Sequence, residues 1–86
     1  MQIVFSPQAK DDLDFWIKSG DKTITKKIIK LIESIKETPF QGIGKPEPLK
    51  HQLTGYWSRR INKEHRLIYQ VNQNNILIFS AKGHYL

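Results

Sequence analysis

The second half of this chain carries a carboxylate and a histidine whose types and surroundings suit acid–base chemistry. Glu47 stands among lysines, and nearby cations stabilise a carboxylate in its charged form, in which it can act as a general base. His84, close to the end of the chain, is of the type best matched to proton transfer near neutral pH. As an alternative, Glu47 could form a surface salt bridge with Lys45 or Lys50. His84 could likewise belong to a frayed chain end.

Two arginines lie in a segment that we expect to fold as a hairpin. If the loop is the three residues 62–64, Ile61 pairs with His65, and Arg60 pairs directly with Arg66. Like charges opposite one another in a sheet are destabilising, and a protein tolerates them where an anion sits between them. With a loop of two or four residues the register changes, and the two side chains are solvated arginines at a sheet edge. The residues alone leave both interpretations open.

The first half of the chain reads as one strand and two helices that must position these residues. An apolar strand at 2–6 leads into Ser6-Pro7, which is typical of an N-cap followed by proline at the first helical position. Gly20 can end the first helix, and Asp21 can cap a second one that stops at Thr38-Pro39. Apolar residues recur at helical spacing in both helices: Ala9, Leu13, Trp16 and Ile17, then Ile24, Ile28, Leu31, Ile32 and Ile35.

Residues 40–50 are expected to form an irregular loop, because two glycines and two prolines interrupt any helix or central strand there. Strands follow at 56–61, 65–71 and 76–82, and the near-continuous apolar run of the last predicts a central place in the sheet. His65 reads as a structural histidine. The order βααβββ predicts an α+β fold in one domain, residues 1–86. We expect a four-stranded, mostly antiparallel sheet with two helices packed on one face.

Composition excludes several classes of protein. The chain has no cysteine, which rules out a disulfide scaffold, a thiol nucleophile and redox chemistry and fits a reducing cytoplasm. No apolar run approaches the ~20 residues of a membrane span, and no secretory signal is visible. Three scattered histidines and two acids in the second half do not form a metal-ligand pattern, so we expect no metal and no other cofactor.

Positive charge is concentrated in the second half of the chain. The net charge is +6, and residues 41–86 carry seven Lys and Arg against two acids. All three arginines lie within 59–66. Arginine's planar fork suits phosphate, so this distribution predicts a polyanionic partner such as nucleic acid.

Three separated segments resemble the YoeB (Txe) toxins, a branch of the RelE-like toxins of bacterial toxin–antitoxin systems. They are GKPEPLKH at 44–51, GYWSRRINKEHRLIY at 55–69 and the terminal HY at 84–85. The resemblance implies a microbial-RNase-like fold and an endonuclease that cuts messenger RNA in the A site of the translating ribosome, without a metal. It also implies neutralisation by a YefM-type antitoxin, and a toxin that is often dimeric.

The resemblance also implies roles for individual residues. Glu47 matches the family's general base, His84 its general acid, and Arg66 the residue that stabilises charge on the scissile phosphate. Further positions match residues that hold phosphate, assist the site or orient the substrate: Lys50, Arg60 and Tyr85. The chain departs from the family before the terminal HY, where Lys82 and Gly83 replace the usual arginine and aromatic residue, and Leu86 extends one residue beyond the usual end. Lys82 keeps the positive charge of that arginine without its bidentate fork, so we expect it to bind phosphate as well.

The residues themselves are compatible with the same mechanism. RNA cleavage by its own 2′-OH needs a base for that hydroxyl, an acid for the departing 5′-oxygen and cations for the developing phosphorane charge. The main alternative is a basic module that binds RNA or the ribosome and blocks translation without cutting, which would not require Glu47 or His84. A domain that binds only an acidic protein is a third possibility.

Overall fold

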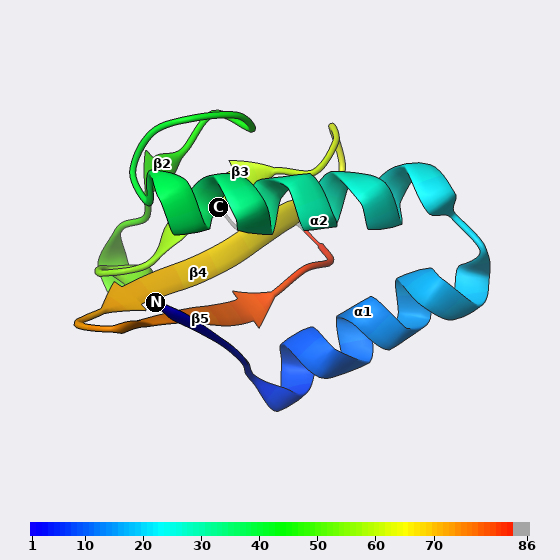
Figure 1. Cartoon of the computed structure of the whole chain (residues 1–86), viewed down its shortest axis with the longest axis horizontal. Coiled ribbons are helices and arrows are strands. Elements are labelled where there is room, and N and C mark those ends of the chain that lie inside the picture. The colour runs from blue at the N-terminus through cyan, green and yellow to red at the C-terminus, as the bar shows by residue number, and fades with distance from the viewer. Residues whose placement is uncertain (84–86) are drawn as a thin grey trace.

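The computed structural model describes residues 1–83 of the chain, which form a sheet with two helices packed on one face (Figure 1). Five strands make up one mixed sheet in the order β1-β5-β4-β3-β2. The elements are β1 (Gln2–Phe5), α1 (Pro7–Ser19), α2 (Lys22–Glu37), β2 (Glu47–Pro48), a short 3₁₀ helix (His51–Leu53), β3 (Trp57–Arg60), β4 (Arg66–Asn72) and β5 (Asn75–Ser80). No helix within these residues is long and apolar enough to cross a membrane.

The predicted α+β class and the central place of the last strand are confirmed, but the strand count was one too low. β5 lies between β1, its parallel neighbour, and antiparallel β4. The additional strand is β2, which lies inside the segment expected to be irregular and pairs antiparallel with β3. A proline is compatible with this pairing because β2 is an edge strand, where one side of the backbone needs no ladder partner.

The helix boundaries follow the local signals closely. The Ser6 hydroxyl accepts a hydrogen bond from the Ala9 amide at 3.0 Å and caps α1, which ends at Gly20 with a left-handed φ of 76°. The Asp21 carboxylate accepts from the Ile24 amide at 3.0 Å and caps α2. One expectation fails, because Ile17 is 66% exposed rather than part of the buried stripe of α1.

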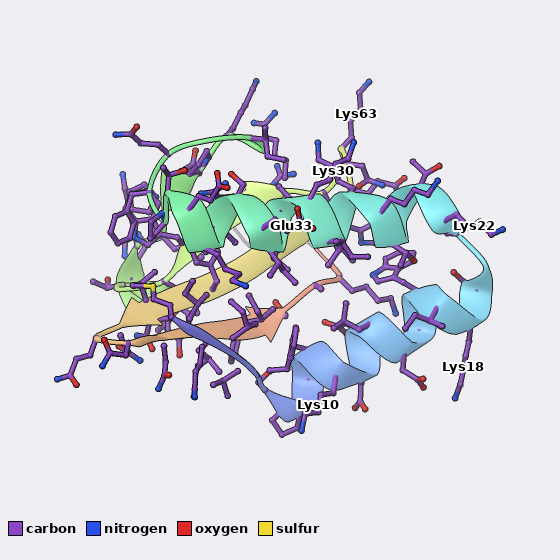
Figure 2. The ribbon with its side chains drawn as sticks, viewed as in Figure 1. Lys10, Lys18, Lys22, Lys30, Glu33 and Lys63 are labelled. Atoms are coloured by element: carbon purple, nitrogen blue, oxygen red, sulfur yellow. The ribbon has the colours of Figure 1, made fainter. Side chains whose placement is uncertain are left out.

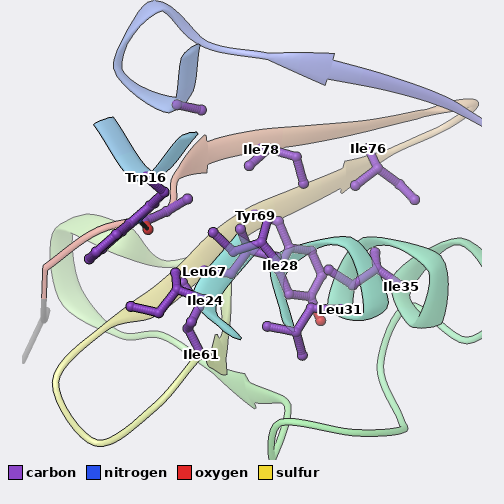
Figure 3. Packing of buried hydrophobic residues seen from close by; sticks show 12 residues of the cluster. Trp16, Ile24, Ile28, Leu31, Ile35, Ile61, Leu67, Tyr69, Ile76 and Ile78 are labelled. Carbon is purple, nitrogen blue, oxygen red and sulfur yellow. Dashed lines mark hydrogen bonds between the residues drawn. The ribbon is translucent and has the colours of Figure 1, made fainter. Parts of the chain in front are cut away.

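The core lies between the helices and one face of the sheet (Figure 3). α2 contributes four buried aliphatic side chains, and α1 contributes Ala9 and Trp16. Full burial of one such aliphatic side chain stabilises the fold by about 1.5–3 kcal/mol. The opposing surface comes from the sheet and from the residues that directly follow β3 and β5, and it consists of Ile61, Leu67, Tyr69, Ile76, Ile78 and Ala81.

The hairpin between β3 and β4 has the three-residue loop that places the two arginines opposite each other. Arg60 pairs with Arg66, and the Ile61 amide donates to the His65 carbonyl at 3.0 Å. The Asn62 side chain closes the loop, because its oxygen accepts from the amides of Glu64 and His65, both at 2.8 Å. An Asx-type turn of this kind selects the loop length and therefore the register.

Candidate active site

Strand pairing brings the predicted base onto the face of the sheet that the helices leave open. Glu47 pairs with Ser58, and Ser58 pairs with Ile68, so one row crosses β2, β3 and β4. Side chains alternate between the two faces of a strand. Since Arg59 and Leu67 are buried toward the helices, their neighbours Arg60 and Arg66 share the opposite face, called here the open face, with this row. On this face Glu47 and Arg60 are exposed, whereas Ser58 and Ile68 are buried.

The arginine pair places two cationic side chains on this face. Arg60 is exposed and Arg66 is half-buried. The Arg66 guanidinium donates to the Asn62 carbonyl at 3.1 Å, which orients it along the hairpin. Two cations paired across strands repel each other, and a bound phosphate would remove that repulsion.

Glu47 is exposed on the edge strand β2. It pairs with Ser58, which lies two residues before Arg60 on β3, so Glu47 is offset along the sheet from the arginine pair. Within residues 1–83, neither Lys45 nor Lys50 forms an ion pair with it, so the salt bridge considered above is absent there. Lys50 is exposed at the start of the 3₁₀ helix that follows β2. In this part of the chain no three His, Asp or Glu side chains gather as metal ligands would.

The chain returns to this site immediately before its C-terminus. The Gly83 amide donates to His65 Nδ1 at 2.9 Å, and the Gly83 carbonyl accepts from the Arg66 amide at 2.9 Å. His65 is thus the structural histidine that its position predicted. The predicted general acid His84 and the predicted substrate-orienting Tyr85 lie outside the described residues.

The comparisons with known proteins identify the family. A family model described as the YoeB-like toxin of bacterial type II toxin–antitoxin systems matches residues 5–85. The chain belongs to the YoeB toxin family. The toxin is 49% identical over 85 residues to Toxin YoeB of Escherichia coli K12, a match covering 99% of this chain and 100% of that protein.

Two solved structures from Staphylococcus aureus show the same fold. The YoeB dimer has a TM-score of 0.90 and 52% identity, covering 99% of the toxin and 98% of that chain. The heterotetrameric YoeB–YefM toxin–antitoxin complex has a TM-score of 0.88 and 52% identity, with the same coverage. The family expected from the three sequence segments is therefore confirmed.

Lys82 has a different setting from the other predicted phosphate-binding residues of the toxin. Its ammonium nitrogen lies 3.9 Å from the centre of the Phe15 ring in α1, within the range of a cation–π contact. The charged end of Lys82 therefore lies against α1. A role at a phosphate stays a prediction for Lys82.

The expectation that all three arginines meet a polyanionic partner is wrong for Arg59. It is fully buried, and its guanidinium binds the loop that follows α2. Nη2 donates to the carbonyls of Thr38 and Gln41, both at 2.7 Å, and Nη1 donates to the Ser34 hydroxyl at 2.7 Å. The strand alternation of 57–60 was a signal for this, because adjacent arginines on one strand cannot both face solvent on the same side.

Proposed function

We propose that the toxin is an endoribonuclease that cuts messenger RNA in the ribosomal A site by attack of the RNA's own 2′-OH. The observation that carries the proposal is the open sheet face, where Glu47 shares one surface with the paired Arg60 and Arg66. A carboxylate beside two cations is the combination that a phosphoryl transfer without an external nucleophile requires. The resemblance to the YoeB family supplies the substrate class.

In the proposed reaction, Glu47 removes the proton of the 2′-OH, and the 2′-oxygen attacks the adjacent phosphorus. Arg60 and Arg66 stabilise the added negative charge, with Lys50 assisting. The bond to the 5′-oxygen breaks, and His84 gives that oxygen its proton while Tyr85 orients the substrate. The products are a 2′,3′-cyclic phosphate and a 5′-OH end. General acid–base assistance contributes about 10²–10⁴-fold per group.

We also propose that a YefM-type antitoxin neutralises the toxin in the cytoplasm, as the S. aureus YoeB–YefM complex supports. A flexible acidic segment suits the charge of residues 41–86, because it can cover a basic surface and become ordered on binding. Homodimer formation is proposed on the precedent of the S. aureus YoeB dimer.

The decisive experiment examines the products on ribosomes programmed with a defined message. The upstream fragment should end in a 2′,3′-cyclic phosphate, and the downstream fragment should begin with a 5′-OH. A single 2′-deoxy substitution before the cut should stop cleavage and leave binding nearly unchanged. Efficient cutting of the deoxy message, or a 5′-phosphate product, would show that water is the nucleophile.

Primer extension on messages from cells that express the toxin separates cutting from simple blockage. New 5′ ends within messages would support the nuclease. Stalled but intact messages would instead support the non-cleaving inhibitor, for which the two arginines would suffice.

A further inference from the structure

A cationic groove adjoins the open face at Arg60. It lies between α2, the loop at 44–45 and the tip of the β3–β4 hairpin. The lining residues are Lys27, Gly44, Lys45, Arg60, Ile61, Asn62 and Lys63. Four of these seven residues are cationic, and none is acidic. Figure 2 shows Lys63 projecting outward from the hairpin, beyond α2.

The backbone at Gly44 explains why these cations come together. The Gly44 carbonyl accepts from the Arg60 amide at 2.6 Å, and its φ is 82°. A Cβ at this position would stand 2.7 Å from the Leu31 side chain and 3.2 Å from the Arg60 carbonyl oxygen. Only glycine lets the loop lie this close to β3, and this approach places Lys45 beside the groove.

The charges of the groove have no carboxylate partner within residues 1–83, where the ion pair present joins Lys18 to Asp14 on α1. Since Arg60 belongs both to the groove and to the arginine pair, the cationic surface is continuous from the candidate site. We propose that the groove binds a backbone phosphate of the RNA strand next to the scissile phosphate. This proposal rests on the proposed function.

The lining favours a nucleic acid over an acidic peptide. Its apolar residue is Ile61, which is 6% exposed and offers almost no surface to a partner. Peptide segments obtain much of their affinity from apolar anchors in pockets. A phosphate backbone, in contrast, is bound by lysine and arginine through charge and counterion release.

The experiment compares two triple variants of equal net charge. The groove variant is Lys27→Gln/Lys45→Gln/Lys63→Gln, which keeps Arg60. The control changes lysines on α1 and at the start of α2, well away from Lys63 in Figure 2: Lys10→Gln/Lys18→Gln/Lys22→Gln. Affinity for a single-stranded 2′-O-methyl RNA oligonucleotide, which 2′-OH attack cannot cut, is measured by fluorescence anisotropy over a salt series.

The groove variant should bind the oligonucleotide at least about tenfold more weakly at low salt. The slope of log K against log salt should become shallower by about 0.7 for each phosphate that the variant no longer neutralises. The control should keep the wild-type slope.

An unchanged slope in the groove variant, or equally weakened binding in both variants, would overturn the proposal. So would a groove variant that no longer binds poly-glutamate but keeps RNA binding. If the wild type binds the oligonucleotide but leaves no cyclic phosphate ends on messages in the ribosome experiment described above, the proposed function fails and the groove stands.

A second and independent observation concerns the segment 81–83. The Asp12 carboxylate accepts from the Ala81 amide, and the Trp16 indole donates to the Ala81 carbonyl, both at 2.9 Å. His65 and the Arg66 backbone satisfy both backbone groups of Gly83. Two helix side chains and one hairpin therefore hold the backbone that leads directly to residue 84.

Burial makes these interactions specific. Asp12 is 4% exposed, and a carboxylate that deep is tolerated only when it is hydrogen-bonded, here also by the Gln8 amide at 2.8 Å. The Trp16 ring contacts His65 edge to face at 4.8 Å between centroids. Gly83 has no side chain to anchor. We infer that Asp12, Trp16 and His65 are positioning residues for the predicted general acid, an inference that also rests on the proposed function.

Trp16→Phe and Asp12→Asn test this inference on ribosomes, with kcat and KM measured separately below the unfolding temperature. Misplacing a reacting group by about 1 Å costs up to about 10²-fold, so kcat should fall tenfold or more while KM stays within about twofold. Ile24→Val, a core change of modest cost, is the control for reduced stability and should keep the wild-type kcat. Wild-type kcat in both folded variants, or a change confined to KM, would overturn the inference.

Discussion

Arg59 and Arg60 are neighbours on β3, yet one belongs to the interior and the other to the open face. A guanidinium has five N–H donors. In Arg59 these reach five acceptors, which are the side-chain oxygens of Ser34 and Tyr69 and the carbonyls of Thr38, Gln41 and Ile43.

Arg60 presents the opposite case. Its guanidinium makes no hydrogen bond with residues 1–83, and it faces Arg66 across the hairpin. A cation whose donors are all satisfied has no capacity left for a phosphate, whereas a solvated cation beside a second cation gains from binding one. The same residue type thus stabilises the loop from one side of β3 and, on the other, keeps its donors available for the phosphate that we propose binds there.

The largest expected effect on stability comes from removing the buried hydrogen bonds of Arg59. Arg59→Met should lower the free energy of unfolding by about 3–5 kcal/mol, because it leaves several buried acceptors without a donor. Arg60→Met, the matched change one residue later, should alter it by less than about 0.5 kcal/mol. Urea denaturation of both variants measures the difference. Similar destabilisation of the two would contradict the contrast between the faces.

Breaking the open side should remove activity and leave the fold intact. Glu47→Gln should reduce the rate of RNA cleavage by about 10²–10⁴-fold, because the amide cannot accept the 2′-OH proton. Its unfolding temperature should match the wild type, since Glu47 is exposed and makes no ion pair within residues 1–83. Growth inhibition with expression controls reports the same defect in cells. A fully toxic Glu47→Gln variant would show that the carboxylate is not the base.

A smaller effect is expected at Tyr69, where the interior network ends. Its hydroxyl donates to the Pro39 carbonyl at 2.6 Å, so Tyr69→Phe should cost about 1–3 kcal/mol near neutral pH. Burial raises the pKa of the Tyr69 hydroxyl above its ordinary value of 10.0, and the nearby Arg59 opposes this shift.

This pKa shift gives the substitution a pH signature. Above pH 10.0 the tyrosine ionises in the unfolded chain before it ionises in the folded one, so the wild type becomes less stable as pH rises through that range. Tyr69→Phe should lack this part of the decrease. Denaturation midpoints measured between neutral and strongly alkaline pH test the sign. Parallel curves for the two proteins would contradict it.

Removal of free metal ions is expected to have no effect on the cleavage rate. If the arginine pair and Lys50 supply the positive charge at the scissile phosphate, EDTA should leave the cleavage rate unchanged. The assay must be free of ribosomes or keep their magnesium sufficient. Inhibition that added magnesium or manganese reverses would show that the open face needs a metal to complete it.

Local signals in the sequence were sufficient for both helices and for four of the five strands, and they limited the hairpin loop to two, three or four residues. The caps at Ser6 and Asp21, the stop after α2 and the three-residue hairpin loop each depend on interactions between residues only a few positions apart. Such interactions are readable because they do not depend on the rest of the fold. The opposition of Arg60 and Arg66 follows from a loop of three residues, a length that the sequence left open and the structure shows.

Only the tertiary structure decided which residues share a surface. The row from Glu47 through Ser58 to Ile68 exists because β2 adds to the edge of β3, and the tail returns to His65 because α1 binds Ala81. Arg59 turns inward because the loop after α2 presents carbonyls to it. These interactions join residues far apart in the chain and form together, when the core is buried. No local propensity contains that information.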